Sequence, residues 1–434
     1  MTAAVIGGGW AGLSAAARLR RAGHNVVVFE ASRTLGGRAR RVDSPSLNTS
    51  IDNGQHLLIG AYSETLALMR DLGLKPEALF DRLPLALSAA DGSFALRVPK
   101  LPAPLHLLGA ILCAHGLRLK ERLAVAGLIQ SLKRRAWITP PGQTVAQWLH
   151  QGQQSAHVIR MLWQPLCLAA LNTPLDLACA QLFARVLKDS LGGPRSACDV
   201  LLPRVDLTRL WPDQVEQAFT ATDGADLTVR RGHAVRQLAL HRSGVQLDGE
   251  FFDTVVVASN TPAALRLLKQ LPVSDAGRRY VQMLEAFTFL PIATVTLQFK
   301  HAWRLPQAML LLQDDPARLQ FGQWLFDRDG RFNVVVSDAR ALQSAPRQET
   351  IAAIIQQVRE QTRGFGHMPD VSCHETIIEK RATFAAVPGL ARPGNRTPWE
   401  RVWAAGDWTD TGYPGVLEGA VRSGRDAAAL IGKA

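Results

Sequence analysis

The sequence predicts an α/β fold in which a Rossmann-like nucleotide-binding domain is assembled from separate segments of the chain and a second, α+β domain is inserted between them. Residues 2–6 and 25–29 are short, mostly apolar stretches, typical of parallel strands covered on both faces. A glycine-rich turn and an Ala-rich helix over residues 13–21 connect them. Residues 402–405 form a similar stretch, so both ends of the chain are expected in one domain.

The composition excludes intrinsic disorder for the chain as a whole. Of the 434 residues, 47% are hydrophobic and 20% are charged, which is enough to bury a large core. Lys and Arg outnumber Asp and Glu by 49 to 37, which gives a net charge of +12. Such a charge favours nucleic acid, acidic substrates or an anionic membrane surface as partners, or it reflects only an arginine-rich composition.

Five scattered cysteines form no Cys-x-x-Cys pair, and the histidines show no metal-ligand spacing. We therefore expect neither a disulfide framework nor a metal site. No apolar run reaches the ~18 residues of a membrane-spanning helix. Because residues 2–6 already form the first predicted strand, we expect no secretory signal and a cytoplasmic location. With three tyrosines and no RNA-binding motif, nucleic acid is not expected as a partner.

Hydrophobic periodicity and breaker residues predict the remaining elements. The predicted helices are 63–72, 105–115, 119–134, 144–150, 157–171, 178–189, 349–362 and 416–431. The predicted strands are 227–229, 234–240, 251–258, 292–299, 308–312, 320–326, 332–336 and 375–381. From this pattern we assign residues 1–100, 215–275 and 385–434 to the nucleotide-binding domain, and residues 101–214 and 276–384 to the inserted domain.

The turn after the first predicted strand matches the pattern G-x-G-x-x-G at Gly7, Gly9 and Gly12. Gly7 permits the tight turn, Gly9 lets backbone N–H groups approach a diphosphate, and Gly12 lets the following helix pack closely on the sheet. The residues between the glycines, Trp10 and Ala11, place the start of the helix at the anion. A structural glycine turn in another kind of α/β protein is the alternative.

An acid follows the second predicted strand at the spacing that a dinucleotide site requires. Glu30, with Ala31 beside it, is about twenty residues beyond the glycine motif, where a carboxylate accepts hydrogen bonds from ribose hydroxyls. The position of this acid makes a nucleotide site more probable than a structural turn alone.

Three further segments resemble the flavin amine oxidase and phytoene desaturase superfamily. They are Leu35-Gly36-Gly37-Arg38, Trp403-Ala-Ala-Gly406-Asp407, and the run Gly-Val-Leu-Glu-Gly-Ala-Val-Arg-Ser-Gly that starts at Gly415. The resemblance implies an FAD cofactor. In the superfamily, the segment of Gly36, Gly37 and Arg38 binds the diphosphate, and the segment of Gly406 and Asp407 binds the ribityl chain.

The same resemblance implies further contacts with FAD. The start of the closing helix would face the pyrimidine end of the flavin, where a helix N-terminus stabilises negative charge; its residues are Gly415, Val416, Leu417 and Glu418. Val235 lies where the superfamily offers backbone contacts to adenine, although a core valine in a strand would look the same.

Two longer strings narrow the resemblance. One runs from Asp52 to Tyr62, Asp-Asn-Gly-Gln-His-Leu-Leu-Ile-Gly-Ala-Tyr, and the other runs from Leu166 to Pro174. Together they resemble the squalene-associated FAD enzymes of bacterial hopanoid pathways, the hydroxysqualene dehydroxylases. The resemblance places part of the first string along the flavin, namely Asn53, Gly54, Gln55 and His56.

Two positions differ from the amine oxidases of the superfamily. Those enzymes have an aromatic residue two positions before the glutamate of the closing helix, where this chain has Val416. Their lysine near the flavin would fall at Ala293. An apolar wall suits a hydrocarbon better than an amine.

The resemblance implies a reaction in which the allylic hydroxyl of hydroxysqualene is replaced by hydrogen to give squalene, with hydride from reduced flavin. Candidates for the proton donor are His56, because a histidine titrates near neutral pH, and Tyr413 in the loop before the closing helix. A neutral histidine bonded to the backbone, or a tyrosine that only lines the pocket, are the alternatives.

Other functions are compatible with the same motifs. An FAD-dependent carotenoid or isoprenoid desaturase, or an amine-oxidase-like oxidase, would use the same geometry with hydride moving onto FAD. A non-catalytic isoprenoid-binding chaperone on this fold would have a degenerate cofactor site, whereas here the glycines and acids of the motifs are all present.

Residues 101–137 have the composition of an interfacial membrane anchor. Residues 105–113 are strongly apolar, and the stretch from Arg118 to Arg135 contains six basic residues and one acidic residue. We therefore expect peripheral contact with the inner face of the cytoplasmic membrane. The alternative is a core helix followed by a solvated amphipathic helix.

Overall fold

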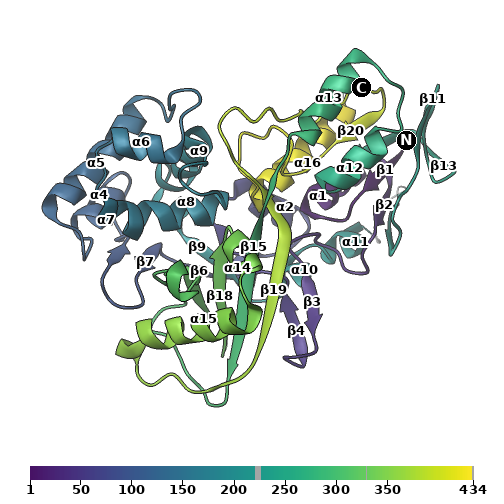
Figure 1. The fold of residues 1–434 in the computed structure, drawn as a ribbon. Helices are drawn as coiled ribbons and strands as arrows, with labels where there is room; N and C mark the ends of the chain where they lie inside the picture. Colours follow the sequence, from purple (N-terminus) through teal and green to yellow (C-terminus); the bar gives the residue numbers. More distant parts are fainter. Residues whose placement is uncertain (220–225, 329, 433–434) are drawn as a thin grey trace.

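The computed structural model describes residues 1–219, 226–328 and 330–432. Residues 220–225, 329 and 433–434, which belong to the predicted segments 215–275, 276–384 and 385–434, lie outside the described residues. A parallel sheet forms the centre of one half of the molecule, on the right of Figure 1. Its described strands, in spatial order, are β10 (Leu227–Arg231), β2 (Asn25–Glu30), β1 (Thr2–Ile6), β14 (Thr254–Val257) and β20 (Val402–Ala404).

Both faces of this sheet are buried, and the side chains of β1 alternate between two cores. Ala3 and Val5 belong to the core that includes helices α1 (Trp10–Arg21) and α16 (Leu417–Ile431). Ala4 and Ile6 belong to the core of the opposite face, which includes helix α12 (Thr261–Leu268). Because side chains alternate along a strand, a strand covered on both faces needs apolar residues throughout, which confirms the predicted α/β fold.

The first and last long helices of the chain, α1 and α16, touch at a glycine. A Cβ at Gly424 would lie only 2.2 Å from the main-chain oxygen of Ala11 and 2.8 Å from Cβ of Ser14. The hydroxyl of Ser14 donates a hydrogen bond to the main-chain oxygen of Val421 at 2.9 Å. Figure 1 shows the resulting contact between the two ends of the chain.

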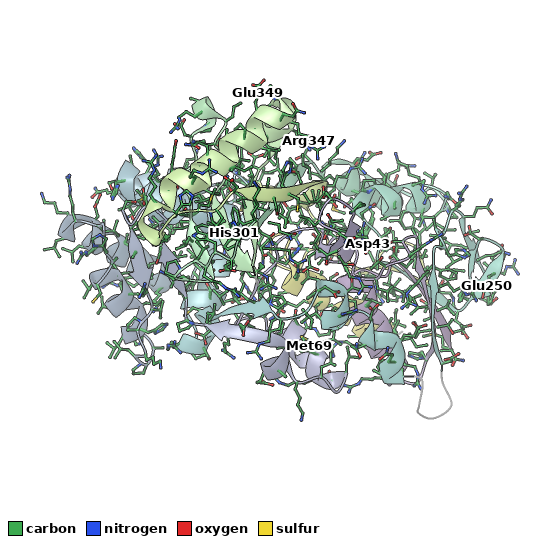
Figure 2. All side chains as sticks on the ribbon, turned by 90° about the horizontal axis from the view of Figure 1, so that it is seen from below. Asp43, Met69, Glu250, His301, Arg347 and Glu349 are labelled. Carbon is green, nitrogen blue, oxygen red and sulfur yellow. The ribbon has the colours of Figure 1, made fainter. Side chains whose placement is uncertain are left out.

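The second half of the molecule contains an antiparallel sheet, drawn in green shades below the centre of Figure 1. Helix α15 (Arg347–Gln361) covers one face through Ile351, Ile354 and Val358, and Figure 2 labels Arg347 and Glu349 at the outer start of this helix. The described strands, in spatial order, are β16 (Met309–Leu311), β17 (Trp324–Arg328), β18 (Arg331–Ser337), β15 (Phe289–Phe299) and β19 (Val371–Phe384).

A lobe of helices, blue at the left of Figure 1, packs beside both sheets. It contains α4 (Leu105–Leu112), α5 (Leu119–Arg134), α6 (Val145–Gln151), α7 (Ala156–Val158), α8 (Gln164–Leu171) and α9 (Ala180–Leu191). The single helix predicted over 157–171 is wrong in one respect, since Ile159–Trp163 form a π-helix between α7 and α8. Pro165 has no N–H and crowds the carbonyl four residues earlier, so the turn before it widens.

Short elements complete the described fold. The small strands are β3 (Arg41–Ser44), β4 (Thr49–Asp52), β5 (Leu58–Ile59), β6 (Phe80–Leu83), β7 (Ala86–Ser88), β8 (Ala95–Arg97), β9 (Val200–Pro203), β11 (Leu238–His241), β12 (Gly244–Leu247) and β13 (Glu250–Phe252). The remaining helices are α2 (Ser63–Asp71), α3 (Pro76–Leu79), α10 (Leu207–Leu210), α11 (Gln214–Phe219), α13 (Asp275–Glu285) and α14 (Arg340–Ser344).

Two predicted strands start later than expected because side chains take their N–H groups. The strand predicted over 234–240 begins at Leu238, since the carboxylate of Asp248 accepts hydrogen bonds from Arg236 and Gln237 at 3.0 and 2.7 Å. The strand predicted over 320–326 begins at Trp324, and the N–H of Gly322 donates to Oε1 of Gln357 at 2.9 Å.

The parallel sheet draws strands from all three segments assigned to the nucleotide-binding domain, whereas β9, from a segment assigned to the inserted domain, pairs with β5 and β6. The proposed domain boundaries stay a prediction. None of the helices in the described part of the chain combines the length and apolar character needed to cross a membrane.

Substitution Gly424→Ala should destabilise the fold, because the added methyl group meets the backbone of α1 at Ala11. We expect the free energy of unfolding to fall by about 2 kcal/mol, measured by urea denaturation. The matched control is Gly127→Ala in α5, where an added Cβ meets nothing within 4 Å and a helical alanine is favoured. Equal stability of the two variants would contradict the close contact of α1 with α16.

Candidate functional site

A tight turn at the carboxyl end of β1 brings the backbone close to α1. Gly7 has a φ of +114°, and a Cβ there would lie 2.7 Å from the main-chain oxygen of Ala258. A Cβ at Gly12 would lie 1.9 Å from the main-chain oxygen of Gly7. These two positions of the predicted motif therefore require glycine, as its physical interpretation expects.

The N-terminus of α1 has no side-chain cap. Gly9 is the N-cap residue, and the helix begins at Trp10 and Ala11. The first N–H groups of a helix have no partner within the helix, and the aligned peptide dipoles add positive potential there. The start of α1 can therefore bind an anion such as a diphosphate.

A second glycine segment lies directly against the first. Gly9 forms a bridge with Gly36, and the N–H of Gly36 donates to the main-chain oxygen of Gly8 at 2.9 Å. Gly37 has a φ of +64°, and a Cβ there would lie 3.1 Å from Cα of Gly9. The two predicted segments thus form one surface of bare backbone, which a diphosphate can approach closely.

Glu30 ends β2 beside this surface. Its carboxylate accepts hydrogen bonds from the N–H of Gly8 at 2.6 Å and from the N–H of Ser32 at 2.7 Å. Ala31 follows Glu30 and is exposed. Val235 is buried, and its main-chain oxygen accepts a hydrogen bond from Arg266 at 3.0 Å. Glu30 is therefore held by main-chain groups at the carboxyl edge of the sheet, where nucleotides bind in this type of fold.

Arg38 and Asp407 form an ion pair that joins the two ends of the chain. Nη2 of Arg38 lies 2.5 Å from Oδ1 of Asp407, and Nη1 donates to the main-chain oxygen of Ala382 in β19 at 2.9 Å. Burial opposes the charge of Arg38, but Asp407 outweighs it and raises the pKa of the guanidinium. A Cβ at Gly415 would lie 3.3 Å from Oδ2 of Asp407, so three predicted segments meet here.

The start of α16 lies close to this ion pair along the chain, and its acid has a structural role. Glu418 is buried, and its carboxylate accepts hydrogen bonds from the N–H groups of Glu64 and Thr65, each at 3.0 Å, at the start of α2. Nε of Arg422 donates to the same carboxylate at 2.9 Å. Val416 is the N-cap residue and Leu417 begins the helix, without a side-chain cap. The first N–H groups of α16 have no partner within the helix and can therefore bind a ligand.

The string Asn53–His56 lies between the two sheets. Oδ1 of Asn53 accepts a hydrogen bond from the N–H of Arg40 at 3.4 Å. Oε1 of Gln55 accepts one from Asn333 in β18 at 2.8 Å, and the N–H of Gln55 donates to the hydroxyl of Thr294 in β15 at 3.4 Å. The string therefore connects the nucleotide-binding half of the site with the second half.

His56 is a neutral histidine bonded to the backbone. Its Nδ1 lies 3.0 Å from the main-chain oxygen of Gly54, and burial lowers the pKa of the ring. The neutral ring donates its Nδ1 proton to that oxygen, which leaves Nε2 as an acceptor.

Strand β15 lies opposite this string, and it presents a different residue to the string than the sequence interpretation expects. Ala293 is buried in the core of the second sheet, whereas its neighbour Thr294 contacts the string at Gly54 and Gln55. Because side chains alternate along a strand, Thr294 and not Ala293 faces the string. Neither residue carries an ammonium group.

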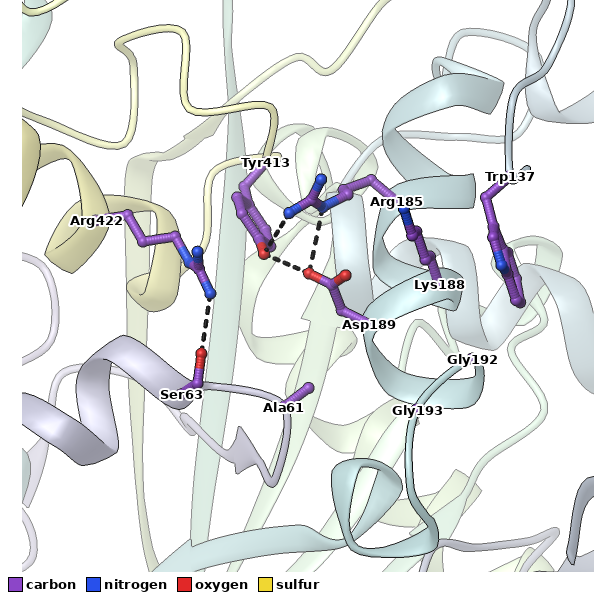
Figure 3. Close-up of a pocket in the computed structure, with 10 residues that line it drawn as sticks. All are labelled: Ala61, Ser63, Trp137, Arg185, Lys188, Asp189, Gly192, Gly193, Tyr413 and Arg422. Atoms are coloured by element: carbon purple, nitrogen blue, oxygen red, sulfur yellow. Dashed lines mark hydrogen bonds and ion pairs between the residues drawn. The ribbon is translucent and has the colours of Figure 1, made fainter. Parts of the chain in front are cut away.

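Tyr413 lines an open pocket of about 380 Å³ between α9, the start of α2 and the loop before α16 (Figure 3). Its hydroxyl donates a hydrogen bond to Asp189 and accepts one from Arg185 at 3.0 Å. The guanidinium groups of Arg185 and Arg422 lie 4.8 and 5.0 Å from the centre of its ring. Burial and the bond to Asp189 raise the pKa of Tyr413, so its proton is held against a carboxylate.

Sequence reasoning gave no role to two residues that shape the site. Asn172 ends α8 with a left-handed φ of 49°, donates to the hydroxyl of Thr383 at 3.1 Å and accepts from the N–H of Asp338 at 2.7 Å. An asparagine at the end of a predicted helix was a usable signal. Partly buried Arg392 donates to the main-chain oxygen of Asp407 at 3.0 Å, and no local sequence pattern indicates this contact.

In the part of the chain that the structure describes, no group of three or more His, Cys, Asp or Glu side chains is placed to hold a metal ion. The site instead offers an uncapped helix N-terminus, two bare glycine segments and the guanidinium of Arg38. These groups fit the diphosphate of a dinucleotide.

Asp52 precedes the string between the sheets, and its environment shifts its pKa towards neutral pH. Its Oδ1 accepts a hydrogen bond from the N–H of Leu207 at 2.9 Å. Burial, with a contribution from Asp206, raises the pKa of Asp52 to about 6 against the opposing effects of that hydrogen bond and of two arginines. In the folded protein, Asp52 therefore stays protonated up to a higher pH than it does in the unfolded chain.

Substitution Asp52→Asn should change how stability depends on pH. An aspartate in the unfolded chain titrates near about 4, so between that pH and about 6 the folded wild type holds a proton that the unfolded chain has lost. The wild type loses stability as pH rises through this window, and the variant lacks that loss. We expect the free energy of unfolding of the variant, relative to that of the wild type, to rise by about 1–2 kcal/mol between pH 4 and 8, measured by urea denaturation. Asp43→Asn on β3 is the control. If the stability of Asp52→Asn depended on pH as that of the wild type does, the raised pKa would be contradicted.

The family model of the flavin containing amine oxidoreductases matches residues 10–432. Hydroxysqualene dehydroxylase of Rhodopseudomonas palustris is 31% identical, over 99% of this chain and 98% of that protein. The protein of the same name from Zymomonas mobilis is 26% identical, over 98% of both. Among solved structures, cyclohexylamine oxidase from Brevibacterium oxydans IH-35A has the same fold, with a TM-score of 0.70 and 19% identity over 100% of this chain and 98% of that chain.

Both the family model and these relatives extend over nearly the whole chain, and the matched range of the family model includes the segment of Gly36 and Gly37 and the start of α16. The protein is an oxidoreductase with a flavin cofactor, and it belongs to the flavin containing amine oxidoreductase family and, within it, to the hydroxysqualene dehydroxylases.

Proposed function

We propose that the protein is an FAD-dependent hydroxysqualene dehydroxylase, which removes the hydroxyl of hydroxysqualene reductively and forms squalene. The main support is the near full-length similarity to dehydroxylases. The absence of a lysine at Ala293 and Thr294 also disfavours an amine substrate.

In this proposal the cofactor is FAD, and the predicted residues bind it. The diphosphate would be bound by the start of α1, the two glycine segments and Arg38, and the ribose by Glu30. Arg38 is paired with Asp407 at 2.5 Å, so the same guanidinium would orient both the diphosphate and the acid that accepts from the ribityl chain. The start of α16 would stabilise negative charge on the reduced ring.

When bound and reduced, FAD supplies the hydride that replaces the allylic hydroxyl. The chain has to exclude water, hold the reacting carbon and provide the proton with which the hydroxyl leaves as water. Asn172 and Thr383 fix the end of α8 against β19, so they position the wall beside Gly415 without contributing a charge.

His56 is the proposed proton donor. Its ring is neutral at pH 7 with Nδ1 committed to Gly54, so it must first take up a proton at Nε2. Because its pKa is lowered, the protonated form becomes rarer as pH rises. Tyr413 is the second candidate, with a proton held by Asp189.

Turnover by anaerobically reduced enzyme tests the proposed reaction. The purified protein is reduced, mixed with hydroxysqualene, and followed by flavin absorbance and by mass analysis of the lipid extract. We expect reoxidation with one squalene formed per flavin.

A flavin that stays reduced while the substrate demonstrably binds would contradict the dehydroxylase and favour a desaturase or oxidase. A colourless protein that releases no FAD on denaturation would favour an isoprenoid-binding chaperone.

Substitution His56→Ala should leave FAD bound but lower the turnover number by about 100-fold or more. In the wild type we expect the turnover number to fall as pH rises through a pKa below 6.5, since only protonated His56 can donate. Stopped-flow reoxidation across pH measures both effects.

Tyr413→Phe is the matched variant. If Tyr413 donates the proton, this variant loses turnover instead, and activity in the wild type persists to a pKa above 10.0. Unchanged turnover in His56→Ala would remove His56 from the mechanism.

We further propose that the protein acts in the cytoplasm in peripheral contact with the inner face of the membrane. A long isoprenoid alcohol and a hydrocarbon product both dissolve in lipid rather than in water, so an enzyme that handles them benefits from direct access to the bilayer.

A further inference from the structure

Exposed apolar side chains gather on one part of the helical lobe. Eleven large apolar residues are exposed in the described chain, and six of them lie between residues 101 and 123. They are Leu101, Leu105, Leu108, Leu112, Leu119 and Leu123. Single exposed leucines are common in proteins, but a group of this kind marks an interaction surface.

The leucines of α4 share one face of the helix. Leu105, Leu108 and Leu112 are spaced by three and four residues, so they project from the same side. The opposite side of α4 is buried at Leu107, Ala110 and Ile111, and the last two belong to the core. The exposed leucines are therefore additional to the residues that the core requires.

The leucines of α5 continue this face. Leu119 and Leu123 are 66% and 57% exposed and lie one turn apart at the start of the helix. Nη1 of Arg122 donates to the main-chain oxygen of Leu112 at 2.6 Å, and its Nε donates to that of Leu117 at 3.0 Å. These bonds hold the end of α4 against the start of α5, so the two sets of leucines form one surface.

We call this surface the α4–α5 face, and it lies in a strongly basic segment of the chain. Between residues 97 and 135 the chain has one acidic residue, Glu121, whose carboxylate accepts bonds from Ser155 and from the N–H of Arg118. The same segment has eight basic residues, Arg97, Lys100, Arg118, Lys120, Arg122, Lys133, Arg134 and Arg135. Figure 1 shows α4 and α5 at the end of the molecule farthest from both termini, where a flat partner can reach them.

Exposed leucines in a strongly basic segment complement one partner best, an anionic lipid bilayer. The leucines can enter the boundary between headgroups and acyl chains, while the arginines and lysines pair with lipid phosphates. A second protein with an apolar patch would need an acidic rim of its own.

We propose that the α4–α5 face docks on anionic membranes, with its leucines inserted and its basic residues bound to the headgroups. This inference deepens the proposed function, on which it rests for its biological purpose, because it names the surface through which a lipid-soluble substrate would be reached. The physical docking does not depend on turnover and is measured without it.

Vesicle co-sedimentation of the full-length protein tests the proposal. We expect stronger binding to phosphatidylcholine vesicles with about 30% phosphatidylglycerol than to phosphatidylcholine alone, and weaker binding in high salt. The triple variant Leu105→Ser, Leu108→Ser, Leu112→Ser should lower the partition constant about tenfold or more. Its control is the double variant Phe251→Ser, Val273→Ser, which removes exposed apolar residues elsewhere and should bind as the wild type does.

The charges are tested separately. Arg134→Ser with Arg135→Ser should lower partition onto the anionic vesicles about 30-fold, at about 1 kcal/mol per basic residue. The control is Arg242→Ser, in the exposed turn between β11 and β12, which should leave partition onto these vesicles unchanged. If the triple variant fails to fold by circular dichroism, Leu119→Ser with Leu123→Ser at the same face replaces it.

Binding that is equal on neutral and anionic vesicles, or that persists in both leucine variants, would overturn the proposal. A leucine variant that changes only the sedimentation mass in the absence of vesicles would identify a second copy as the partner instead. Squalene formation from detergent-solubilised substrate, measured in parallel, shows whether the proposed reaction stands when docking fails.

Discussion

The ion pair between Arg38 and Asp407 joins residues that are 369 positions apart in the chain. Asp407 is 5% exposed, and a buried carboxylate without a partner would cost several kcal/mol. The pair can form only if the end of the chain docks on its beginning, which the contact of α16 with α1 at Gly424 achieves. The site therefore depends on the closure of the chain.

Other acids of the site accept hydrogen bonds from main-chain N–H groups, and Glu418 is also paired with Arg422. Glu30 accepts from Gly8 and Ser32, and Glu418 accepts from the start of α2. Carboxylates bound in this way are held in position, so they orient the glycine segments and the start of α16. In the proposed reaction, proton transfer falls to groups of a different kind, the imidazole of His56 or the hydroxyl of Tyr413.

The second half of the molecule contributes to the site by contact with a short string of residues. Gln55 is bound by Asn333 and by Thr294, which belong to strands β18 and β15 of the antiparallel sheet. The same sheet presents Ala382 to Arg38 through β19. A shift of the second sheet would therefore move both Arg38 and the string that contains His56, which couples the two halves of the molecule.

The sequence by itself determined the features that depend on neighbouring residues. The turn at Gly7 and Gly12, the continuous apolar run of β1 and the acid at Glu30 follow from local geometry, and the structure has each of them. Only the tertiary structure decided which groups meet across the chain: Arg38 with Asp407, Glu418 with the start of α2, and Thr294 in place of Ala293 beside Gly54. Such partners are chosen by packing and by the register of distant strands, which no local pattern encodes.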